Sequence, residues 1–143
     1  MEKSIKAEDI RALFELEPED IRSYSPLTLA YVGDAVYELV IRTMIISKGN
    51  APVNKLHKRS AALVKAPAQA QMMKVIEPLL SEEELHIYKR GRNAKSYTSA
   101  KNASVIDYRI ATGFEALMGW LYLQERQERM LELIKIGLNE LPQ

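Results

Sequence analysis

The sequence contains no cysteine, so it forms neither disulfide bridges nor thiolate-bound metal sites. Only two of its 143 residues are histidine, too few for a typical zinc site. Any metal ion here would therefore be a hard cation bound by carboxylate oxygens, such as Mg²⁺ or Mn²⁺. The absence of cysteine also fits a reducing compartment, and we expect a cytoplasmic protein.

Long apolar runs are scarce as well. The most apolar stretch, residues 27–45, is interrupted by Asp34, Glu38 and Arg42, and falls short of the ~18 uninterrupted residues that a membrane span needs. The first residues lead into a charged amphipathic segment and not into a signal peptide. We therefore expect no membrane partner. The length predicts one domain, residues 1–143.

The expected fold class is all-α, because no segment alternates apolar and polar residues as a strand does. Helical spacing and capping signals instead predict about seven helices. These are residues 5–16, a central helix from 26 to about 47, helices that open at Pro52, Pro67 and Ser81, and helices over 105–123 and 128–138. Residues 91–102 have few apolar anchors and are expected to form a loop.

Two of the predicted helices carry isolated carboxylates. The central helix is apolar on almost every face, so we expect it to be buried in a core or against a partner. Burying the ionised Asp34 within it would be costly unless that carboxylate is paired or binds a metal. Glu115 lies on an otherwise uncharged face of helix 105–123. If the two helices pack together, both carboxylates can bind one hard cation. The small residues that would allow close approach are Gly33, Ala35, Ala116 and Gly119.

The segments around both carboxylates resemble a known family. Val-Gly-Asp-Ala-Val-Tyr-Glu at 32–38 resembles the signature of ribonuclease III, and Phe-Glu-Ala-Leu-Met-Gly-Trp-Leu-Tyr-Leu at 114–123 resembles its second motif. Arg-Gly-Arg-Asn-Ala-Lys at 90–95 and the short remainder after the second motif resemble Mini-ribonuclease III. That branch consists of the catalytic domain without a separate double-stranded-RNA-binding domain. The resemblance spans about residues 20–140.

This resemblance implies a homodimeric bundle of helices that cleaves double-stranded RNA and leaves 5′-phosphate ends. Asp34 and Glu115 match the family's catalytic and metal-binding residues, with Mg²⁺ as the cofactor and Mn²⁺ as a substitute. The implied substrate is a stem of precursor large-subunit (23S) ribosomal RNA, with a ribosomal protein or pre-ribosomal particle as a candidate partner. Two further acids of full-length ribonuclease III are replaced by Ala30 and Thr112. We therefore expect one metal ion to bind securely and a second only weakly.

A basic block follows the predicted helix that begins at Ser81. Residues 86–103 contain five lysines and arginines and no acid, on a chain whose net charge is only +1. Such a local block predicts a defined anionic contact. Lysine and arginine bind phosphates, while asparagine can reach 2′-hydroxyls in the minor groove of RNA. The residues assigned to RNA binding are Lys89, Arg90, Arg92, Asn93, Lys95 and Lys101.

Other interpretations of these residues stay open at this point. Asp34 could be a structural carboxylate paired with Arg42 or Lys101, and Glu38 is expected to be structural and not catalytic. The reduced number of acids also fits a non-catalytic dimer that binds structured RNA. An all-α nucleotide pyrophosphohydrolase would likewise use carboxylates on helices with magnesium. That class repeats acids along its helices, which these two helices do not.

Overall fold

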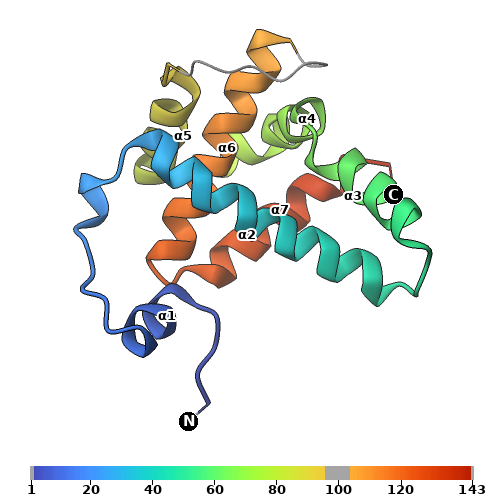
Figure 1. Ribbon diagram of the computed structural model, residues 1–143. Coiled ribbons are helices and arrows are strands. Elements are labelled where there is room, and N and C mark those ends of the chain that lie inside the picture. The colour runs from blue at the N-terminus through green and yellow to red at the C-terminus, as the bar shows by residue number, and fades with distance from the viewer. Residues whose placement is uncertain (1, 96–103, 143) are drawn as a thin grey trace.

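Figure 1 shows the computed structural model, which describes residues 2–95 and 104–142. These residues form seven α-helices and two short 3₁₀ helices, with no strand among them, which confirms the predicted all-α class. No helix in these ranges is long and apolar enough to cross a membrane. The elements are α1 (Ala7–Leu13), η1 (Ile21–Ser23), α2 (Pro26–Ser47), α3 (Val53–Val64), α4 (Ala66–Ile76), η2 (Glu77–Leu79), α5 (Glu82–Asn93), α6 (Val105–Leu123) and α7 (Gln127–Leu138).

Three of the helices, α2, α5 and α6, begin where a serine side chain accepts a hydrogen bond from a free N–H group of the first turn. Ser25 caps α2 by accepting a hydrogen bond from a backbone N–H of that turn. Ser81 and Glu84 form the predicted capping box at the start of α5. Ser104 caps α6 in the same way as Ser25 caps α2. These starts were predictable because each depends only on neighbouring residues.

The loop predicted over residues 91–102 begins later than expected. α5 continues to Asn93, and Gly91 in its last turn is buried against α6. A Cβ at Gly91 would lie 2.8 Å from the Cβ of Ala116, so glycine permits this close packing. The contact with α6 therefore extends α5 beyond its last apolar residue. Residues 96–103 of the predicted loop lie outside the described ranges.

α2 and α6 cross so closely that their backbones touch. A Cβ at Gly33 would lie 1.8 Å from the carbonyl oxygen of Glu115, and one at Gly119 would lie 2.0 Å from a carbonyl oxygen of α2. Neither position can hold a larger residue without moving a helix. The predicted role of small residues is confirmed for these two glycines. Ala116 instead faces α5, and Ala35 is exposed.

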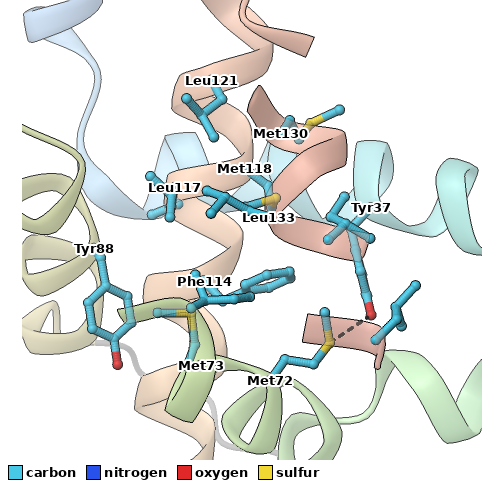
Figure 2. Packing of buried hydrophobic residues seen from close by; sticks show 14 of the residues in the cluster. Tyr37, Met72, Met73, Tyr88, Phe114, Leu117, Met118, Leu121, Met130 and Leu133 are labelled. Atoms are coloured by element: carbon cyan, nitrogen blue, oxygen red, sulfur yellow. Dashed lines mark hydrogen bonds between the residues drawn. The ribbon is translucent and has the colours of Figure 1, made fainter. Parts of the chain in front are cut away.

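Aromatic and sulfur-containing side chains fill the core beside this crossing (Figure 2). The rings of Tyr37 and Phe114 pack edge to face, with their centroids 5.0 Å apart. The buried Tyr37 hydroxyl donates to the carbonyl of Leu63 at 2.8 Å and contacts the sulfur of Met72 at 3.3 Å. The polar group of Tyr37 is thereby satisfied inside the core.

The central helix α2 is not buried on every side. Its buried stripe faces the core and consists of Leu29, Ala30, Gly33, Tyr37, Ile41 and Ile45. The opposite side is open to solvent, with Tyr31 83% exposed and Leu39 48% exposed. Asp34 is also exposed. The prediction that Asp34 is buried was therefore wrong for the single chain, because Asp34 lies at the edge of the covered side, next to Glu115 but open to solvent.

Gly33→Ala should lower the free energy of unfolding by about 3 kcal/mol or more, because the added methyl group meets backbone atoms. Gly137→Ala in α7 is the matched control, since its added methyl group meets mainly the side chains of Ile76 and Met72. The ends of those side chains can move, although the Cβ of Met72 at 2.9 Å cannot, so the control should lose about 1 to 2 kcal/mol, less than Gly33→Ala. Urea denaturation measures both values, and equal losses would contradict the close crossing.

Candidate active site

The crossing of α2 and α6 brings Asp34 and Glu115 together. Gly33, which precedes Asp34, packs directly on the backbone of Glu115. The carboxyl group of Asp34 lies close enough to that of Glu115 to raise its pKa. The structure therefore contains the pair that the sequence predicts, with Asp34 exposed and Glu115 partly buried.

The environment of Glu115 favours its protonated form. Burial and then the nearby carboxylate of Asp34 raise the pKa of Glu115 to about 8. The amide group of Gln69 acts in the opposite direction, since it donates a hydrogen bond to Glu115 Oε2 at 3.3 Å. At neutral pH the metal-free site therefore keeps a proton on Glu115.

Gln69 is a site residue that sequence reasoning missed. It lies on α4 with 1% of its surface exposed, and its Nε2 also donates to the carbonyl of Val64 at 3.0 Å. Its Oε1 is buried and has no hydrogen-bond partner among the described residues. A glutamine within a helix rich in alanine carries no signal of such a role, because glutamine is an ordinary helix former. Only the packing of α4 against α6 reveals it.

Glu38 lies one turn after Asp34 and forms an ion pair with Arg42 at 3.2 Å. Its charge is also a minor cause of the raised pKa of Glu115, which places it near the site. Because Arg42 pairs with Glu38, it is not the structural partner considered for Asp34. The second such partner, Lys101, lies outside the described ranges. The structural role of Glu38 stays a prediction, and the ion pair supports it.

The two positions without the expected acids contribute no further ligand. Ala30 is buried, and the buried Thr112 donates its hydroxyl to a carbonyl of its own helix at 3.0 Å. No group of three or more histidine, aspartate or glutamate side chains among residues 2–95 and 104–142 is arranged to hold a metal ion. Asp34 and Glu115 are therefore the two candidate metal ligands at this point.

The predicted RNA-binding residues that the structure describes lie at or just beyond the end of α5. Arg92 is partly buried, and its guanidinium group lies 5.6 Å from the centre of the Tyr88 ring. Cations in the last turn of a helix also interact favourably with the helix dipole, so the block has a structural role as well. Lys101 is not among the described residues. The exposed members of the set are Lys89, Arg90, Asn93 and Lys95.

Comparison with known proteins agrees with this geometry. The family model for the ribonuclease III domain matches residues 27–126. Mini-ribonuclease 3 of Clostridium tetani is 53% identical, covering 87% of this chain and 83% of that protein. Mini-ribonuclease 3 of Thermoanaerobacter sp. is 52% identical, covering 86% and 87%. The fold also matches an X-ray structure of a protein from Fusobacterium nucleatum, with a TM-score of 0.76, 36% identity, and coverage of 85% of this chain and 97% of that one.

The chain thus combines an all-α fold, a pair of carboxylates at a helix crossing, and a family match over most of its length. The chain belongs to the ribonuclease III family. Its relatives within that family are Mini-ribonucleases 3, which confirms the resemblance seen at residues 32–38 and 114–123.

Glu115→Gln should stabilise the metal-free protein at about pH 8. The pKa of Glu115 is about 8 in the folded protein but about 4.3 in an unfolded chain. Between these values the folded protein binds more protons, so its stability falls as the pH rises. The glutamine side chain does not titrate, so the Glu115→Gln variant does not lose stability in this way as the pH rises. Since one pKa unit corresponds to about 1.4 kcal/mol, the gain at high pH should exceed roughly 1 kcal/mol.

Thermal unfolding at about pH 4 and pH 8 measures this effect, because at the lower pH Glu115 is protonated in the folded protein and mostly protonated in the unfolded chain. Glu38→Gln is the control on the same site and should show no gain, because it breaks the ion pair with Arg42. A Glu115→Gln variant that is less stable than the unmodified protein at the higher pH would contradict the proton on Glu115.

Proposed function

We propose that this protein cleaves double-stranded RNA with a divalent cation bound by Asp34 and Glu115. As a member of the ribonuclease III family, the chain is a double-strand-specific endoribonuclease. The observation that supports the metal role is the proximity of two carboxyl groups at the crossing of α2 and α6, where Gly33 packs on the backbone of Glu115. Membership of this family also favours cleavage over the two alternatives, a non-catalytic RNA binder and a nucleotide pyrophosphohydrolase.

The residues at this point fit a hard cation. Both candidate ligands are carboxylates, which magnesium and manganese prefer. A positive ion would favour the charged form of Glu115, which burial and Asp34 disfavour. When bound, such an ion supplies an activated water and neutralises charge at the phosphate that is cleaved.

Asp34 and Glu115 have different roles in metal binding. Asp34 is exposed, so a cation that it binds can also contact water and an RNA phosphate. Glu115 is partly buried and held by Gln69, and must release its proton before it can bind a cation. Since Ala30 and Thr112 offer no carboxylate, we propose that one metal ion binds securely and a second only weakly.

We assign the homodimer contact to the open side of α2. Apolar side chains are exposed along this face, and a surface of this kind on a globular protein usually marks an interface. Two joined copies would supply two sites, as the cleavage of both strands requires. The exposed apolar residues of this helix include Leu27, Tyr31, Leu39 and Ile46.

The biological setting is the part of the proposal that rests on resemblance. It comprises a stem of precursor 23S ribosomal RNA as the substrate, a ribosomal protein or pre-ribosomal particle as a further partner, and the cytoplasm as the location. The organisation of residues 1–143 as one catalytic domain belongs to the same proposal. In it, the basic end of α5 contacts the RNA backbone.

Asp34→Asn should reduce cleavage of double-stranded RNA by about 100-fold or more at saturating Mg²⁺, because it removes a ligand charge and keeps the side-chain shape. RNA binding, measured by gel shift, should persist. Glu38→Gln is the control on the same helix and should keep most of the activity. Full cleavage by Asp34→Asn would overturn the catalytic assignment. If the unmodified protein binds RNA and never cleaves it, the non-catalytic alternative is correct.

Changing Lys89 and Arg90 together to glutamate should weaken RNA binding at low salt. The slope of log affinity against log salt concentration should fall by about two, one for each lost phosphate contact. The matched control changes the exposed Lys55 and Lys58 to glutamate on α3, which lies on the other side of the molecule in Figure 1. An unchanged slope for the α5 pair would remove this end of α5 from the RNA surface.

A further inference from the structure

The side-chain amide of Gln69 has only one possible orientation. The carbonyl of Val64 lies 3.0 Å from its Nε2 and can only accept a hydrogen bond. The nitrogen of the amide, and not its oxygen, must therefore face Val64. The second hydrogen of the same nitrogen is then available to Glu115 Oε2 at 3.3 Å.

This orientation has a cause in the chain itself. Val64 is the last residue of α3, and the carbonyl groups at the end of a helix have no partner within that helix. Gln69 in the first turns of α4 supplies the missing donor. Because Gln69 is 1% exposed, its side chain cannot turn toward solvent. The packing at the junction of α3 and α4 therefore places the Gln69 N–H donor next to Glu115 on α6.

The remaining polar atom of the Gln69 amide, Oε1, needs a hydrogen-bond donor that the described residues do not supply. It is buried and accepts no hydrogen bond from them. Buried acceptors are almost always paired with a donor. A donor to this oxygen therefore comes from elsewhere, and a water molecule is the simplest candidate. A water held by a cation at Asp34 and Glu115 would meet this requirement.

We propose that Gln69 is a positioning residue for the metal ligand Glu115. Its N–H donates to Glu115 Oε2 and fixes the orientation of this carboxyl group, which leaves the other oxygen for a cation shared with Asp34. This inference rests on the proposed function, since it assumes the metal site at Asp34 and Glu115. It adds a residue that is neither acidic nor part of the two family motifs.

Binding of Mn²⁺ to the RNA-free protein, followed by electron paramagnetic resonance, tests this role without any need for catalysis. Gln69→Leu and Gln69→Met both remove the donor, and Gln69→Met keeps the shape of the side chain and the fold. Both should weaken Mn²⁺ binding by about 10-fold to 100-fold. The matched control is Gln71→Leu, because the exposed Gln71 donates to the carbonyl of Glu140 at 2.9 Å. It should bind Mn²⁺ as the unmodified protein does.

Two further variants separate this inference from the proposed function. If Glu115→Gln loses Mn²⁺ binding while both Gln69 variants keep it, the metal site stands and the positioning role is overturned. A Gln69 variant that loses thermal stability without losing Mn²⁺ affinity likewise means that Gln69 only caps α3. If neither Glu115→Gln nor Asp34→Asn alters Mn²⁺ binding, the proposed metal site is wrong and the inference fails with it.

Discussion

The contact between the backbones of α2 and α6 positions the rest of the site. Gly33 meets the carbonyl oxygen of Glu115, and Gly119 meets the backbone of α2 one turn away. Because the two acids lie at the point of contact, any separation of the helices would also separate their carboxyl groups. Two further helices pack on α6. Gln69 of α4 donates a hydrogen bond to Glu115, and α5 contacts α6 through Gly91. Two residues without side chains thus determine where the two acids meet.

Packing, and not attraction between the acids, keeps this pair together. Burial and, after it, repulsion from the charged Asp34 raise the pKa of Glu115, which reflects the cost of a charged Glu115 at this position. Gln69 offsets part of it with one hydrogen bond. The core around Tyr37 and Phe114 lies beside the crossing and supplies the burial that the acids themselves do not. The site without a metal is therefore a local instability within a well-packed fold, which the proposed cation would relieve.

The helices were largely predictable because their signals are local. The range 105–123 and the capping box at Ser81 were confirmed as predicted. The loop after α5 was placed too early because the packing of Gly91 on α6 involves residues distant in the chain. The burial of Asp34 was wrong for a similar reason: an apolar sequence does not show which side of a helix its neighbours cover.

The sequence by itself determined the helical class, the family and the two acids at Asp34 and Glu115, because capping, periodicity and short motifs can be recognised along the chain. Only the tertiary structure decided which other groups surround those acids. It paired Arg42 with Glu38 and placed Gln69 against Glu115. It also left one apolar side of α2 open. These outcomes depend on the packing of side chains and of whole helices against one another, which no local pattern specifies.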